Sequence, residues 1–245
     1  MSEIRKEYMW QLVVRCVVFV LCLAACFVRP EIFRVLDGMN FFHTLSPLHL
    51  LWLLWVVDLT YQVIPLKNKV ALGSQKLFAH RFRPIREKIN REALHRYMTT
   101  TNKAAYKVLA LWCALIAVIG VLYYTHVIGK LALFVCCVAF YVCDLICVLI
   151  WCPFRLIMKN KCCTTCRIFN WDHMMMFSPL IFTDGFFTWS LVIYAAVAFV
   201  VWEVFVMLYP ERFWEASNAA LQCSACTDKL CTQYCQKLRR HRKLL

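Results

Sequence analysis

The amino-acid sequence predicts an all-α, polytopic integral membrane protein built as a bundle of about five transmembrane helices. The chain is 62% hydrophobic and 17% charged, whereas soluble domains are roughly 45–50% apolar and about 25% charged. Its apolar runs reach the length of about 20 residues that a helix needs to cross a bilayer. No strand-length alternation suggests a barrel, and lipid offers no partner for an open backbone. The five runs span residues 8–28, 45–64, 104–124, 131–152 and 185–208.

These runs and the polar stretches between them predict six segments. Pro47 is expected to open the second helix in its first turn, and Pro153 is expected to stop the fourth. The segments are an N-terminal hairpin of two helices at 1–64, a basic loop at 65–103, a second hairpin at 104–152, a cysteine-rich linker at 153–184, the last helix at 185–210, and a cysteine-rich basic tail at 211–245.

The net charge of +14 predicts which loops face the cytoplasm. The loop 65–103 holds ten Lys and Arg residues against Glu87 and Glu92. Short loops rich in Lys and Arg lie on the cytoplasmic side, so we place this loop and the N-terminus there, in a multi-pass protein of the cell membrane. No nucleic-acid-binding motif accompanies the basic residues, and we expect no nucleic-acid partner.

The same loop contains apolar residues at helical spacing, with Arg and Lys on the other faces. This pattern predicts a basic amphipathic helix lying on the bilayer and touching anionic lipid head groups. A solvated linker is the alternative. Other membrane proteins are further candidate partners. The apolar residues are Phe78, Phe82, Ile85, Ile89 and Tyr97.

The C-terminal charge conflicts with a simple count of five spans. The tail ends "KLRRHRKLL", which favours the cytoplasm, yet five crossings would leave it outside. Residues 173–208 would reach only about 54 Å as one helix, too short for two crossings of about 30 Å and a turn. We therefore expect "MMMFSPLIFTDGFF" to enter as a re-entrant segment broken at Pro179, Asp184 and Gly185. The tail would then be cytoplasmic, and an external tail is the alternative.

The stretch "LAAC" at 23–26 resembles a bacterial lipoprotein cleavage box. One interpretation is cleavage before Cys26 followed by lipidation. The alternative is a chance match inside the first transmembrane helix. We favour the second, because a polytopic chain gains little from a lipid anchor.

Sixteen cysteines fall into two kinds of environment. Nine lie in or at the ends of the apolar runs, where a free cysteine behaves as a small hydrophobe, and we expect packing roles for most of them. The other seven lie in two polar clusters. The nine are Cys16, Cys22, Cys26, Cys113, Cys136, Cys137, Cys143, Cys147 and Cys152.

The two polar clusters predict a metal site that joins the linker to the tail. Each contains a C-x2-C pair, whose sulfurs can point at one ion. Zinc takes four such ligands at about 2.3 Å, and iron–sulfur clusters use the same thiolates. A reactive or redox thiol pair and plain unliganded cysteines are the alternatives. The candidate ligands are Cys162, Cys163 and Cys166 in the linker, and Cys223, Cys226, Cys231 and Cys235 in the tail.

Asp172 and His173 follow the first cluster closely. They could complete a metal shell or act on a substrate at the membrane surface. The alternative is a helix start, in which Asn170 or Asp172 caps the backbone N–H groups of the apolar segment.

Three carboxylates lie inside apolar runs, where a charge is costly and often functional. Asp144 is the strongest candidate, because it lies deepest; it could pair with Arg15, carry a proton or contact a substrate. Asp58 is a second candidate. Glu203 lies close to the end of its helix and is expected to reach the head groups.

Three functions fit these features. The first is a redox or metal-dependent protein whose cysteine site serves a membrane substrate such as a quinone. The second is a transporter component with Asp58 and Asp144 on the path and the cysteines as a structural clamp. The third is a non-catalytic subunit of a membrane complex. The sequence does not decide whether the protein is an enzyme.

Overall fold

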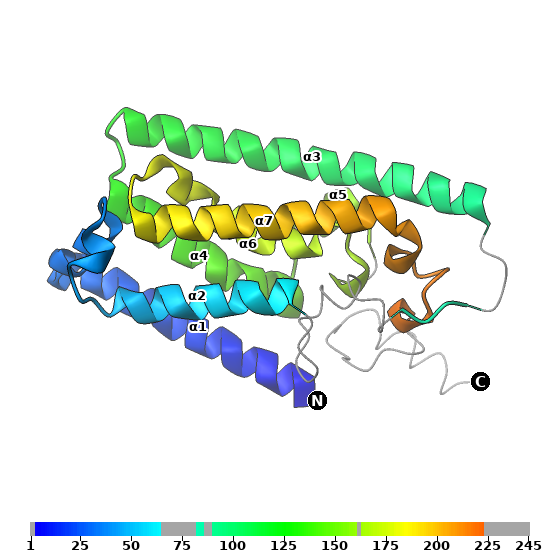
Figure 1. Ribbon diagram of the computed structural model, residues 1–245, viewed down its shortest axis with the longest axis horizontal. Coiled ribbons are helices and arrows are strands. Elements are labelled where there is room, and N and C mark those ends of the chain that lie inside the picture. Colours follow the sequence, from blue (N-terminus) through cyan, green and yellow to red (C-terminus); the bar gives the residue numbers. More distant parts are fainter. Residues whose placement is uncertain (1–2, 65–81, 86–89, 161–162, 223–245) are drawn as a thin grey trace.

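The computed structural model describes residues 3–64, 82–85, 90–160 and 163–222, and these residues form a helical bundle (Figure 1). Within these residues the only strand-like pairing is an isolated bridge between Pro84 and Asn218. The long helices are α1 (Glu3–Val28), α2 (Leu48–Val63), α3 (Arg91–Tyr124), α4 (Lys130–Leu149) and α7 (Phe186–Leu208).

Four of these helices, α1, α3, α4 and α7, are long and apolar enough to cross a membrane. The helix predicted as the second span, α2, is apolar but has 16 residues, which is about 24 Å of helix. It begins directly after Pro47, which stands at the N-cap position, one residue before the predicted first turn.

Short helices connect the long ones. The bundle has two ends, on the right and on the left in Figure 1. The right-hand end is called the cysteine end, because Cys163 and Cys166 lie there; α1 begins at this end, and α2, α4 and α7 finish at it. The left-hand end is called the turn end. The short helices are η1 (Pro30–Leu36) and η2 (Asn40–Phe42) at the turn end; α5 (Arg155–Met158), η5 (Cys163–Thr165), η6 (Phe169–Trp171), α6 (Asp172–Phe177) and η7 (Ser178–Phe182) between α4 and α7; and η8 (Pro210–Phe213) and η9 (Ala219–Leu221) after α7.

The predicted surface helix is not formed at residues 82–85 of the basic loop. Residues 82–85 are not helical, since Pro84 lacks an N–H and disfavours helical geometry in the residue before it. Tyr97 belongs instead to α3, which begins where the Asn90 side chain accepts hydrogen bonds from the backbone N–H groups of Glu92 and Ala93. Phe78 and Ile89 lie outside the described residues.

The segment from η6 to η7 crosses the interior of the bundle beside α7. At the cysteine end, Arg167 just before it pairs with Glu203 of α7. At the turn end, the ring of Phe182 packs against Gly120 and Tyr124 near the end of α3. On α7, Phe186 at the turn end and Glu203 at the cysteine end are seventeen residues apart, which is about 25 Å of helix. Consequently α7 starts at the turn end and returns to the cysteine end (Figure 1).

Backbone irregularity explains how so short a segment covers this length. A 3₁₀ helix rises about 2.0 Å per residue against 1.5 Å in an α-helix. Pro179 stands at the start of η7, where α6 gives way to the 3₁₀ form, and Thr183 beyond η7 is extended. The break is held by Ser178, whose hydroxyl accepts a hydrogen bond from Trp112 Nε1 at 3.0 Å and donates one to the Met175 carbonyl at 2.6 Å.

The core is aromatic and centred on Trp55 of α2, which is fully buried. Its ring lies 5.2 Å from Phe177, 5.8 Å from Tyr141 and 6.1 Å from Phe134. Large apolar side chains also cover the outer faces of the long helices, which suits a lipid environment. Examples are Val13, Val17 and Leu21 on α1, Leu111, Leu115 and Val118 on α3, and Ile193, Val197 and Val200 on α7.

The start of α7 is fixed at the turn end by close backbone packing. The Phe186 N–H donates to the Gly38 carbonyl at 2.9 Å. Gly185 lies so near η1 that a Cβ there would sit 1.9 Å from the Leu36 carbonyl oxygen. Lys130 adds a bridge, with its ammonium 2.8 Å from Asp184 and also in contact with the turn after η1.

We predict that Gly185→Ala destabilises the protein by about 1–3 kcal/mol or more, because the added methyl group meets rigid backbone. Gly129→Ala is the matched control: Gly129 also occupies the position before a helix, at the start of α4, and a Cβ there meets nothing within 4 Å. Unfolding in detergent measures both. Equal stability losses would contradict the packing argument.

Candidate functional site

A charged network lies inside the bundle and is built from several helices. Arg15 of α1 pairs with Asp144 of α4, with Nη1 2.8 Å from Oδ2. The same Nη1 donates to the Tyr141 carbonyl at 2.8 Å, and the guanidinium lies 3.9 Å from the centre of the Tyr141 ring. Asp58 of α2 lies 3.5 Å from Nη2. The predicted Arg15–Asp144 pair is therefore present, and Asp58 joins it.

The network continues into α6. Gln62 of α2 donates to both carboxylate oxygens of Asp172 at 3.0 and 2.9 Å and lies 2.7 Å from Nδ1 of His173. Nδ1 is also 3.3 Å from Asp172 Oδ1. On the other side of the ring, the buried Nε2 atom is 3.9 Å from Asp58 Oδ2 and has no hydrogen-bond partner. His173 therefore lies between two carboxylates.

The helix-start alternative is wrong for Asn170 and holds only in part for Asp172, whose carboxylate accepts a hydrogen bond from the backbone N–H of His173. The N-cap residue of α6 is Trp171, and it makes no side-chain capping bond. Asp172 is the first helical residue, and its carboxylate also faces the side chains of Gln62 and His173. Asn170 is buried in the connection before the helix.

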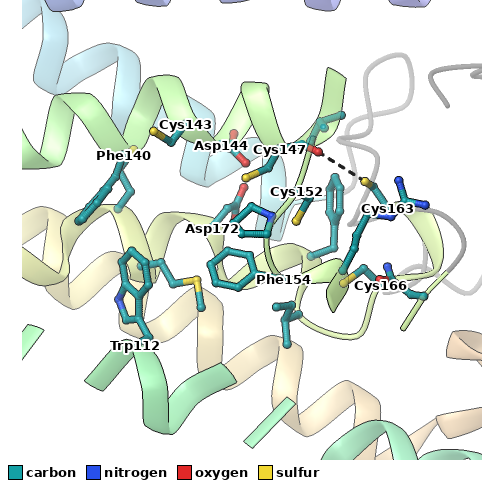
Figure 2. Close-up of a pocket in the computed structure, with 18 residues that line it drawn as sticks. Trp112, Phe140, Cys143, Asp144, Cys147, Cys152, Phe154, Cys163, Cys166 and Asp172 are labelled. Atoms are coloured by element: carbon teal, nitrogen blue, oxygen red, sulfur yellow. Dashed lines mark hydrogen bonds between the residues drawn. The ribbon is translucent and has the colours of Figure 1, made fainter. Parts of the chain in front are cut away.

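A cavity of about 220 Å³ adjoins this network near the cysteine end. Its wall combines aromatic rings, two carboxylates and sulfur, and Figure 2 draws these side chains around the space. The carboxylates are Asp144 and Asp172. Five cysteines line it: Cys143, Cys147, Cys152, Cys163 and Cys166.

Two of the five thiols interact directly. Cys147, at the end of α4, and Cys152, in the loop that follows, both line the cavity (Figure 2), and the Cys147 thiol acts on Cys152 as a hydrogen-bond donor. This bond, helped by the backbone N–H groups of Phe154 and Arg155 and by the charge of Arg155, lowers the pKa of Cys152 to about 7, although burial acts in the opposite direction. Thiolate is the nucleophilic form of cysteine, so Cys152 is the activated member of the pair.

Two cysteines of the first predicted cluster reach the same cavity. The Cys163 thiol donates to the Cys147 carbonyl at 3.8 Å, the dashed line in Figure 2. Cys166 is buried among the apolar residues between α3, α7 and the linker. The structure thus brings linker cysteines together with cysteines of α4 that the sequence assigned to packing.

The metal prediction concerns mostly residues outside the described part of the chain. Cys162, Cys223, Cys226, Cys231 and Cys235 all fall there. Among the described residues, no group of three or more His, Cys, Asp or Glu side chains is arranged to hold a metal ion. Zinc or iron–sulfur ligation by the seven cysteines remains a prediction.

Glu203 does not point to the head groups as predicted. Its carboxylate accepts hydrogen bonds from Arg167 and from Trp171 Nε1, both at 2.8 Å. Arg167 also donates to Asn102 of α3 at 3.0 Å. This buried contact ties the linker to α7 and α3 and fixes where the interior segment begins.

Some site residues could have been inferred from spacing. Cys143 and Cys147 are four residues apart, so on a helix they share one face. Asp144 lies next to the first of them in the sequence. No local signal places Cys152, Gln62 or the linker against that face, because their positions depend on the path of residues 169–182.

Comparisons with known proteins add no assignment: no protein family model, no curated protein and no solved structure matches the chain.

We predict that Arg15→Ala lowers the free energy of unfolding by about 3–5 kcal/mol, because it leaves Asp144 buried without its partner. Asp144→Asn added to Arg15→Ala should recover much of the loss. Arg96→Ala, which removes an exposed pair with Glu92, should cost no more than about 0.5 kcal/mol. Equilibrium unfolding in mixed micelles measures all three, and no recovery in the double variant would contradict the pairing.

The alkylation rate of Cys152 should rise with pH around a midpoint of about 7, because iodoacetamide reacts with thiolate. Cys147→Ala removes the main hydrogen bond and should move the midpoint toward the ordinary thiol pKa of about 8.5, slowing alkylation at pH 7 about tenfold. Quantitative mass spectrometry of the Cys152 peptide gives the rates. Cys143→Ala is the control and should leave the midpoint in place; an unshifted midpoint in Cys147→Ala would exclude the thiol hydrogen bond.

Proposed function

We propose that this protein is an integral membrane thiol oxidoreductase in which Cys147 and Cys152 form the working dithiol and pass two electrons to a membrane-soluble quinone. The observation that carries the proposal is the hydrogen-bonded pair with its activated Cys152, located in a cavity lined by three further cysteines. Redox dithiols need one thiolate of lowered pKa and a partner thiol within reach to form the disulfide.

Charge asymmetry supports placing the cysteine end in the cytoplasm. Basic side chains of the described residues gather at that end, and Lys and Arg mark cytoplasmic loops. Cytoplasmic thiols are kept reduced, so the dithiol would receive its electrons there. At the cysteine end lie Arg5, Lys6, Arg83, Arg91, Arg96, Lys103, Arg155, Lys159, Arg167 and Arg212, and at the turn end Arg29, Arg34 and Lys130.

The cavity suits a single flat ring. Its volume of about 220 Å³ is below the roughly 300–1,000 Å³ of pockets that hold whole drug-sized ligands, so an isoprenoid tail would stay outside. Trp112, Phe140 and Phe154 supply aromatic wall. Cys143 lines the cavity and is also exposed on α4, which puts an opening on a helix face that would contact lipid.

The proposed step balances in atoms and electrons. The Cys152 thiolate and the Cys147 thiol join in an S–S bond and release two electrons and the Cys147 proton. The quinone takes up both electrons and two protons to become the quinol. One proton comes from Cys147, and the second comes from water. Two molecules of a cytoplasmic thiol then reduce the disulfide and become a disulfide themselves.

Cys163 is placed to assist this second half-reaction. Its half-buried thiol lies against the carbonyl of Cys147, on the side of the cavity that faces the linker. A thiol there can attack the Cys147–Cys152 disulfide and hand it on to an external thiol.

We predict that the reduced, full-length protein in lipid nanodiscs reduces ubiquinone-1 in a single turnover and that Cys152→Ser abolishes this reaction, because no disulfide can form. Cys143→Ser, which changes a thiol in the same cavity, should retain most of the rate. Quinol absorbance gives the rate, and mass spectrometry of alkylated peptides identifies the Cys147–Cys152 disulfide.

Other outcomes would redirect the proposal. No quinone reduction by the wild-type protein would overturn it. Zinc or iron bound to the purified protein, and lost in both Cys166→Ser and Cys226→Ser, would favour the metal site. Ion flux in vesicles that survives Cys152→Ser would favour the transporter.

A further inference from the structure

The quinone reaction leaves one proton to be supplied, and the charged network adjoins the cavity where it is needed. Asp172 belongs to both: it lines the cavity, and its carboxylate contacts His173. Asp144 also lines the cavity, but Arg15 holds it at 2.8 Å. Asp172 is therefore the carboxylate that faces the cavity and an imidazole together.

His173 links Asp172 to a second carboxylate on another helix. One ring nitrogen faces Asp172 at 3.3 Å, and the other lies 3.9 Å from Asp58, a separation that a small shift of either side chain closes. Imidazole can accept a proton at one nitrogen and release one from the other. His173 is buried, with 6% of the residue exposed, so water does not reach its ring freely.

Asp58 completes the connection to the outside of the bundle. Its side chain is 39% exposed, and it lies five residues before the end of α2 at the cysteine end. That is about 7.5 Å of helix, within reach of the membrane surface. Carboxylates and histidines in such chains mark proton paths in membrane proteins.

We propose that Asp58, His173 and Asp172 form a proton path from the cytoplasmic face to the cysteine-lined cavity, which protonates the reduced quinone. This inference rests on the proposed function. The groups that face His173 are Asp58 and Gln62 of α2 and Asp172 of α6. Arg15 of α1 lies beside Asp58 and holds Asp144 of α4, whose charge also acts on Asp172 and His173. Gln62 holds Asp172 in place through its amide.

The test is the single-turnover reduction of ubiquinone-1 by reduced, full-length protein in nanodiscs. His173→Gly should slow the reaction about 100-fold at neutral pH, a typical contribution of proton transfer by a positioned side chain. Added imidazole should restore most of the rate. Pyrazole, a ring of the same size but a far weaker base, should not, and this difference separates proton transfer from filling a hole.

Controls and a second variant keep the outcomes distinct. His126→Gly, at an exposed turn-end residue with φ of 60°, should leave the rate unchanged. Asp58→Asn should slow the reaction at least tenfold and flatten its pH dependence, and it serves if His173→Gly does not fold. The proton path would be overturned by normal rates in His173→Gly or Asp58→Asn, or by rescue with pyrazole as well as imidazole. If the wild type still reduces quinone in that case, the proposed oxidoreductase function is unaffected. No reduction by the wild type would remove the function and with it the path.

Discussion

The crossing of the bundle by residues 169–182 determines the rest of the architecture. This segment turns a chain that would end on the far side into one whose last helix returns to the cysteine end. Most of the segment is buried by protein, with Phe177 and Leu180 fully buried. Lipid would leave the open hydrogen-bonding groups of its irregular backbone without partners. The Arg167–Glu203 pair fixes one end of the crossing, and the contact of Gly185 with η1 fixes the other.

The same crossing creates the site. It places Asp172 and His173 near the carboxylates of α2 and α4, which are Asp58 and Asp144. It also places the linker cysteines near the cysteines of α4. Burying charged groups costs several kcal/mol for each ion, and a pair recovers this only with good geometry and further hydrogen bonds. Arg15 has both, since it pairs with Asp144, donates to a carbonyl and stacks on Tyr141. The unpartnered Nε2 of His173 is the part of the network that packing does not explain.

Elements with a strong local signal could be predicted from the sequence, and those set by tertiary contacts could not. The long helices follow from apolar runs, and Pro47 marks the start of α2. The prediction of a surface helix was wrong at residues 82–85, because it gave the spacing of the apolar residues more weight than the helix-breaking effect of Pro84. Glu203 and the cap at Asn170 were misassigned for another reason: their surroundings depend on where the interior segment lies. Treating residues 173–208 as one regular helix leaves out the greater rise of the 3₁₀ turns in η7.

Under the proposed function, electrons and protons would take separate routes to one cavity. Thiols approach it from the linker and the end of α4, where Cys152 lies beyond the last helical turn and can be stabilised as a thiolate by backbone N–H groups. Carboxylates and imidazole approach it from α2 and α6. Asp144 and Cys152 line the same cavity. Without Arg15, the Asp144 carboxylate would be an uncompensated negative charge there, and like charges in a medium of low dielectric repel strongly. The Arg15–Asp144 pair therefore permits an acidic network and an activated cysteine to share the same small space.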